Sequence, residues 1–112
     1  MAAQQPTVVP GVIITMTGTA DVNQYRFIAG SGSQCGAGAR AAGVSFVGVT
    51  AGTPFSVVVS GSFLVELGAA ANAGDEVQSD ANAKAIPLAS GKSNGVLAGS
   101  ATTGDKVPVV IK

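Results

Sequence analysis

The stretch that decides the fold is residues 43–67, GVSFVGVTAGTPFSVVVSGSFLVEL. Apolar side chains alternate with small or polar ones within three short runs, and this spacing places them on one face of a sheet. The runs are separated by TAGTP at residues 50–54 and SGS at residues 60–62, and Gly, Pro and Ser favour turns. The stretch therefore predicts a meander of three strands. It holds three of the four phenylalanines, so we expect it to form the core.

Other β-prone runs lie on both sides of this stretch. Residues 12–17 and 22–29 precede it, and residues 106–111 follow it. Residues 75–79 and 84–88 predict a hairpin, with Asn82 at positive φ and Pro87 at a sheet edge. Many short strands predict an all-β fold, a small compact barrel or sandwich of short antiparallel strands with an extended N-terminal arm.

The period-two spacing predicts a single β domain, residues 11–112, with one core. The side chains expected in that core are Phe46, Phe55, Val57, Phe63, Val65, Val77, Ile86, Val107 and Val109.

A weak internal repeat runs through the second half of the chain. Residues 73–77 (AGDEV) correspond to residues 103–107 (TGDKV), and each Gly-Asp pair predicts a tight turn before a strand that begins with Val. Residues 46–59 also correspond to residues 97–111, with one extra residue in the second copy. So few copies favour a compact β domain over a solenoid.

The first ten residues predict an extended arm, because Pro6 and Pro10 oppose a helix. Two interpretations stay open: a disordered tail, and a strand that pairs with a neighbouring chain. On the second interpretation the residues that contact a partner are Pro6, Thr7, Val8, Val9 and Pro10.

Residues 30–43, GSGSQCGAGARAAG, have no periodicity and predict a long loop. Long loops in compact domains often contact a partner. The residues that we expect to contact a second copy of the chain are Ser33, Gln34, Cys35 and Arg40.

Composition excludes several classes of function. Only 11% of the 112 residues are charged, the net charge is zero, and the six Lys and Arg residues are scattered, which argues against nucleic-acid binding. No run approaches the ~20 apolar residues of a membrane helix. The N-terminus lacks a signal peptide, so we expect synthesis in the cytoplasm. Low charge and 16 glycines around a thin core favour self-association, with a trimer expected.

Catalytic and metal-binding patterns are missing. The sequence has no His, and its single cysteine, Cys35, has no partner for a disulfide and no base to activate it. Asp75, Glu76 and Asp80 form the densest acidic group, which we interpret as a solvated hairpin rim. We therefore expect no enzyme activity, no cofactor and no metal.

Four segments, taken in order, resemble one known family. They are AAGVSFVGVTAG from residue 41, VVVSGSFLVEL from residue 57, AAANAGDEVQSDANAKAIPL from residue 69 and GVLAGSATTGDKVPVVIK from residue 95. Each is a generic β turn and strand, but their order and spacing resemble the small capsid cement, or head decoration, proteins of tailed bacteriophages. The loop around Cys35 has no counterpart in that resemblance.

The resemblance implies a non-enzymatic structural protein of the virion, made in the host cytoplasm. Such a protein binds the outer surface of a phage head as an oligomer, usually a trimer, and stabilises contacts between major capsid subunits. Its partners would be the major capsid protein and other copies of itself.

Two alternatives remain from the residues alone. A tail-fibre or adhesin β domain would share the small strands. A small carrier or clip-type module of an enzyme would share the Ala-Gly-Asp turns, but a carrier needs an exposed lysine flanked by Met, and Lys84 has Ala on both sides.

Overall fold

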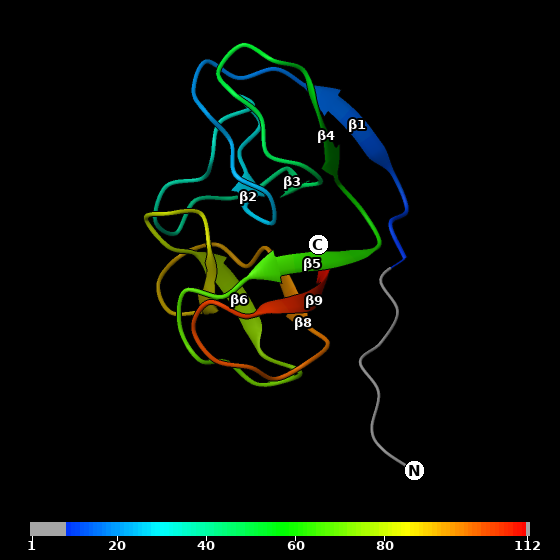
Figure 1. The fold of residues 1–112 in the computed structure, drawn as a ribbon. Helices are drawn as coiled ribbons and strands as arrows, with labels where there is room; N and C mark the ends of the chain where they lie inside the picture. The colour runs from blue at the N-terminus through cyan, green and yellow to red at the C-terminus, as the bar shows by residue number, and fades with distance from the viewer. Residues whose placement is uncertain (1–8, 112) are drawn as a thin grey trace.

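The computed structural model describes residues 9–111, which form nine strands in two antiparallel sheets and no helix (Figure 1). The first sheet has the order β1-β4-β3-β2 and the second β5-β9-β8-β6-β7. The expected all-β fold is confirmed. The strands are β1 (Ile13–Met16), β2 (Phe27–Ile28), β3 (Gly43–Ser45), β4 (Phe55–Val58), β5 (Ser62–Glu66), β6 (Glu76–Ser79), β7 (Ala85–Pro87), β8 (Gly95–Leu97) and β9 (Lys106–Ile111).

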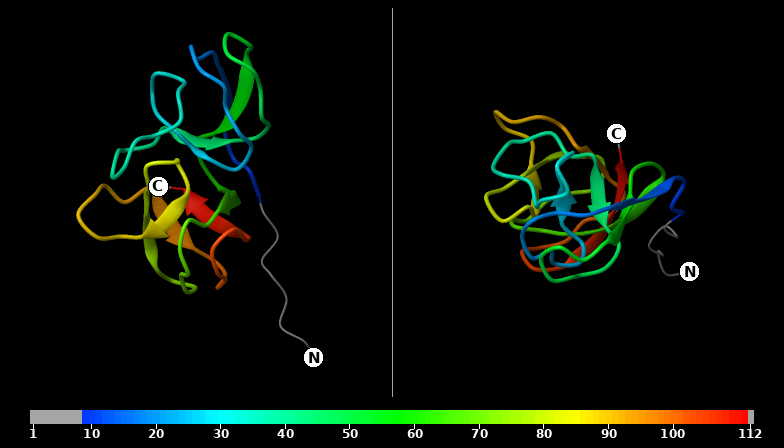
Figure 2. Two further views of the ribbon diagram at one scale, coloured as in Figure 1. Left: turned by 60° about the vertical axis from the view of Figure 1, so that its left-hand side comes forward. Right: turned by 90° about the horizontal axis from the view of Figure 1, so that it is seen from above.

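The two sheets lie one above the other, and the chain crosses from the first to the second between β4 and β5 (Figures 1 and 2). The predicted three-stranded meander is therefore wrong. β3 and β4 do pair, but β5 pairs with β9, far away in the sequence. Gly61 turns the chain at the crossing with a φ of 84°, and the neighbouring Val9 carbonyl leaves no room for a side chain. In the second sheet β5 pairs with β9 over five residues, from Ser62 opposite Val110 to Glu66 opposite Lys106.

The core is divided into two clusters, so the expectation of a single core is wrong. Successive residues of the first sheet point to opposite faces. Val44 and Val58 enter the larger cluster between the sheets, whereas Phe55 and Val57 enter a smaller cluster with Val22 and Ile28. The central strands β3 and β4 are thus buried on both faces, and loop residues such as Val22 and Val49 cover their outer side.

Seven of the nine predicted core residues are buried, namely Phe55, Val57, Phe63, Val65, Val77, Val107 and Val109. The other two predictions are wrong. Phe46 lies just beyond the end of β3 and is 38% exposed, although its ring packs on Phe63 with centroids 5.1 Å apart. Ile86 is only half-buried, because Ala85 takes the inward position on β7.

The predicted hairpin is present as β6 and β7, and Pro87 does lie in an edge strand. The residue at positive φ is Ala83 (64°), however, and not Asn82. The Asp80 carboxylate accepts hydrogen bonds from the backbone N–H groups of Asn82 and Lys84, which fixes the turn around Ala83. The Ala83 methyl is fully buried, and this packing outweighs the intrinsic preference of Asn for that conformation.

The weak sequence repeat corresponds to a repeated turn. Gly74 and Gly104 adopt nearly equal φ values of 89° and 88°. The Gly74 N–H donates to the Leu97 carbonyl, and the Gly104 N–H donates to the Leu67 carbonyl, both at 2.8 Å. Leu97 and Gly104 lie 30 positions after Leu67 and Gly74, so they are the equivalent residues of a second copy of the turn. Each copy therefore donates one backbone hydrogen bond to the other. Ala71 and Ala101 exchange two backbone hydrogen bonds at the centre.

The first sheet contains the same arrangement, which the sequence conceals. Gly52 (φ 80°) donates its N–H to the Gly18 carbonyl, and Tyr25 (φ 63°) donates to the Ser45 carbonyl. Val22 and Val49 exchange the two central hydrogen bonds. The domain is therefore built from four copies of one turn, paired as two reciprocal units. Tyr25 occupies the position that Gly holds in the other three copies.

Replacing Gly74 or Gly104 by Ala tests the repeated turn. An added Cβ meets no atom within 4 Å at either position, so the change isolates the cost of positive φ. We expect a loss of about 1–2 kcal/mol of unfolding free energy for each variant, measured by urea denaturation. The control is Gly36→Ala, which is equally open and has no positive φ. Equal stability of all three variants would contradict the repeat as described.

Phe55, the first residue of β4, and Phe46, which follows β3, give a second test. Phe55→Ala removes a side chain that is 3% exposed and should cost about 3–5 kcal/mol. Phe46→Ala should cost clearly less, because much of its ring already contacts water. Urea denaturation of both variants measures the difference, and an equal loss would show that Phe46 is as central to folding as Phe55.

Candidate functional site

The described residues hold no cluster of three or more His, Cys, Asp and Glu side chains that could bind a metal ion. Cys35 is buried in the core between the sheets, and burial raises the pKa of its thiol to about 11. A thiol with that pKa is protonated at neutral pH and is a poor nucleophile. Among residues 9–111 no helix is long and apolar enough to cross a membrane. A shallow depression lies between Gly74–Glu76 and Pro87–Leu88.

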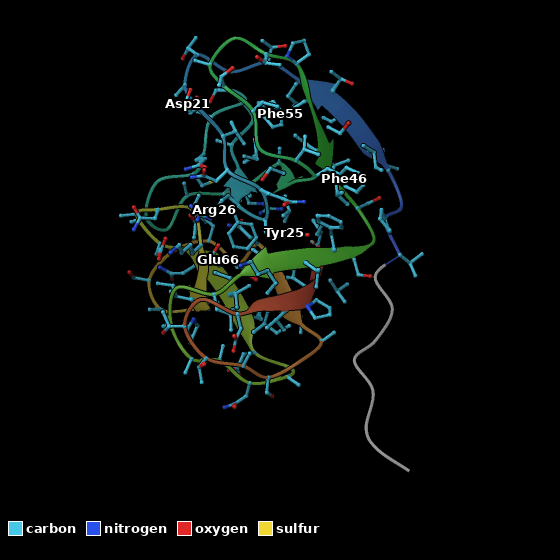
Figure 3. All side chains as sticks on the ribbon, in the orientation of Figure 1. Asp21, Tyr25, Arg26, Phe46, Phe55 and Glu66 are labelled. Atoms are coloured by element: carbon cyan, nitrogen blue, oxygen red, sulfur yellow. The ribbon has the colours of Figure 1, made fainter. Side chains whose placement is uncertain are left out.

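An ion cluster connects the two sheets. Glu66 of β5 lies 3.3 Å from the Arg26 guanidinium, just before β2, and 3.2 Å from the Lys84 ammonium. Figure 3 shows Arg26 and Glu66 facing each other between the sheets. Burial raises the pKa of Glu66, but hydrogen bonds and charge from Lys84 and Arg26 outweigh it, and the pKa lies below its ordinary value. This cluster is a structural link, because all three side chains are largely shielded from solvent.

The base of the predicted arm is attached to the body of the domain. Val9 exchanges hydrogen bonds with Ser62, whose hydroxyl accepts from the Val9 N–H and whose N–H donates to the Val9 carbonyl. Pro10 forms a bridge to Gly61, next to it. Pro6, Thr7 and Val8 lie outside the described residues. The contact with a partner predicted for the arm stays a prediction, with Val9 exposed at its base.

The four predicted loop residues do not form one surface. Cys35 points into the core, whereas Ser33 and Gln34 are half-buried and Arg40 is exposed. Gln34 accepts a hydrogen bond from the Asn23 N–H at 2.7 Å. Any contact of this loop with a second chain would therefore use Ser33, Gln34 and Arg40 and not the Cys35 side chain.

The most unusual surface belongs to β1, the outer strand of the first sheet. Val12, Ile13 and Ile14 are 53%, 47% and 41% exposed, and Val9 before them is 64% exposed. We call Val9, Val12, Ile13 and Ile14 the β1 edge surface. Residues 1–20 contain no charged residue, and neither do residues 41–65, which include the neighbouring strand β4 and the exposed Phe46 beside it (Figure 3).

Sequence reasoning predicted a strand at residues 12–17 but missed this surface. The available signal was the consecutive run Val12-Ile13-Ile14. Three adjacent apolar residues do not alternate, so a strand containing them exposes at least one on each face unless both faces are covered. In the structure β1 is an edge strand, and neither face is fully covered.

Comparison with known proteins gives a family and a fold. A family model described as phage cement protein matches residues 8–111. No curated protein matches the chain. Among solved structures, the crystal structure of the N base of head fiber gp8.5 in bacteriophage phi29 is similar, with a TM-score of 0.76 and 21% sequence identity. The match covers 90% of this chain and 93% of the phi29 chain.

The ion cluster predicts how stability depends on pH. Because the pKa of Glu66 is lower in the folded chain than in the unfolded one, its contribution is complete above the ordinary glutamate pKa of about 4.3 and is lost as the pH falls through the folded-state value. Glu66→Gln should be less stable at neutral pH and lose less stability below about pH 4.3. Thermal melting against pH measures both effects. An unchanged acid profile for Glu66→Gln would rule out this role.

Proposed function

The chain belongs to the phage cement protein family, and from this premise we propose that it binds the outer surface of a phage head as a homotrimer and stabilises contacts between major capsid subunits. The resemblance inferred from the sequence is confirmed by the family match. The protein is a structural component of the phage head and lies on the capsid of the virion. The oligomer and the capsid contacts are the proposed part.

The observation that carries the proposal is the β1 edge surface. An edge strand presents unpaired backbone groups, and natural proteins usually protect such edges with charges, Pro or a covering segment. Here Ile13 and Ile14 are exposed on the edge strand, and the chain around it carries no charge. The centres of protein interfaces are likewise depleted of charge. This surface supports a role in assembly.

A trimer would cover this uncharged surface. Each copy would bury its uncharged surface against other copies, and closed symmetry limits the assembly to a defined number of chains. Ser33, Gln34 and Arg40 are the loop residues proposed to contact a second copy. Pro6, Thr7, Val8, Val9 and Pro10 are proposed to contact a partner as an extended strand, using main-chain hydrogen bonds. Several weak arms on one trimer would act together through effective concentration.

We propose no enzymatic activity for the chain. Its family is one of phage structural proteins, and Cys35, the strongest nucleophile by residue type, is buried with a raised pKa. The carrier alternative is disfavoured by a specific contact: Lys84, the candidate attachment lysine, is bound to Glu66 at 3.2 Å and is only 26% exposed. A carrier lysine must instead be free and exposed. The family match likewise favours the head over a tail fibre.

Deletion of residues 2–8 tests the proposed capsid contact while keeping the hydrogen bonds of Val9 to Ser62. We expect unchanged melting of the domain and reduced co-sedimentation with phage heads that lack cement protein. The matched control is the substitution of Gln4 and Gln5 by Ser, which keeps the arm length and its prolines. Full attachment of the deletion variant would place the capsid contact on the β body instead.

A further inference from the structure

The strand edges of the two sheets are protected unequally. Phe27 of β2 is covered, because its N–H donates to the Ala83 carbonyl and its carbonyl accepts from the Cys35 N–H. The outer side of β5 is covered at both ends, where Ser62 bonds to Val9 and the Glu66 N–H donates to the Tyr25 carbonyl. The outer side of β7 is protected by Pro87 and by the Gly68 N–H, which donates to the Ala85 carbonyl. Three of the four outer strands are thus protected against pairing with a further strand.

The outer side of β1 is different. In the part of the chain that the structure describes, no strand or bridge lies against it. The Val59 N–H donates to the Val12 carbonyl, so the backbone carbonyl of Val12 points toward β4. In an antiparallel ladder the orientation of the backbone groups alternates, so the N–H and carbonyl of Ile14 also point toward β4. The N–H and carbonyl groups of Ile13 and Thr15 therefore point outward. Two residues with outward backbone groups and flanking apolar side chains form a template for one short added strand.

We propose that this template binds the N-terminal arm, residues 2–8, of a neighbouring copy of the chain. The proposal rests on the self-association proposed above and identifies its contact. The arm fits this template because residues 2–8 carry no charged side chain, like the β1 edge surface that they would cover. Thr7 and Val8 are β-branched residues that favour strands, and Pro6 limits the added strand to a few residues.

The dimensions of the arm agree with this contact. β1 has four residues, which span about 13 Å, and seven extended residues span about 23 Å. The arm can therefore cover β1 and still leave about 10 Å to cross between two touching copies. Within one chain, Val9, Gly11 and Val12 are held along Ser60 and Ser62 by four backbone or hydroxyl contacts. Residues 9–12 therefore continue the line of β1, and an arm would have to reverse its direction before Val9 to pair with β1 of its own chain.

The contact is heterologous, since the arm of one copy binds a different surface on the next. Such contacts close into a ring when the rotation between copies permits it, and otherwise continue as a filament. A ring of three arms would join each copy to both neighbours, which agrees with a trimer. It would also cover the β1 edge, which could otherwise pair with the wrong chain.

Amide hydrogen exchange of the free, full-length protein tests the proposal. In the assembled protein the Ile13 and Thr15 N–H groups should be protected, and deletion of residues 2–8 should abolish that protection. Dilution to the single-chain form should have the same effect, because the donor of the arm is another copy. The Gly74 N–H, which donates to Leu97 within the chain, is the internal control and should stay protected throughout.

Thr15→Pro removes one outward N–H and should leave the ladder to β4 intact, because that N–H does not point toward β4. We expect this variant to melt like Thr15→Val, its matched control, and to lose the oligomer mass in sedimentation, as the deletion does. Unchanged assembly of Thr15→Pro and of the deletion variant would overturn the proposal. Protection of the Ile13 and Thr15 N–H groups that survives the deletion would also overturn it, because it would indicate pairing between two β1 strands. Protection that does not depend on protein concentration would overturn it as well, because it would indicate an arm folded on its own chain.

These outcomes are separate from those of the proposed function. Attachment to cement-free heads is measured on the particle, whereas exchange and mass are measured on the free protein. If Thr15→Pro and the deletion variant both assemble normally while the unchanged protein binds heads, the capsid role stays intact and only the contact between arms and β1 is removed. A variant that assembles normally but does not bind heads would leave the arm contact intact and remove the capsid role.

Discussion

The structure depends on one reciprocal interaction that is made twice. A residue at positive φ donates its backbone N–H to a carbonyl at or shortly after the end of a strand in the paired copy, and the paired copy returns the same bond. Gly74 and Gly104 do this in the second sheet, and Gly52 and Tyr25 do it in the first. Because each turn needs its partner to satisfy its backbone groups, neither half of a unit is complete alone. This interdependence lets a small chain with few aromatic residues form a defined β domain.

Much of this architecture could be predicted from local patterns. The alternating residues of β4, β5 and β9 predicted their buried faces, and the Gly-Asp turns before Val77 and Val107 predicted their strands. Two features escaped prediction for physical reasons. The pairing of β5 with β9 is a contact between distant residues, which no local spacing records. The turn at Tyr25 was concealed because an aromatic residue, packed on Phe63, holds a conformation that usually requires Gly.

The residues that we propose to act in assembly were harder to predict than the fold. Reasoning from sequence directed attention to the loop around Cys35, because long loops often carry function. The structure buries that thiol and instead exposes Ile13 and Ile14 on an unprotected edge. A strand can be recognised from sequence, but whether it lies at an edge depends on the order of strands in the sheet. The low charge of the chain gave few candidates for chemistry, and the lack of charged residues in residues 1–20 suits the β1 edge to assembly.

The central claim is that the chain stabilises a phage head by joining neighbouring subunits on its outer surface. Cryo-electron microscopy of cement-free heads incubated with the purified protein tests this claim most directly. The account predicts density for three copies together on the exterior, placed where major capsid subunits meet, with the β1 edges inside the trimer and covered by an added strand. Isolated single copies, density only on the tail, or heads left undecorated at saturating protein would contradict it.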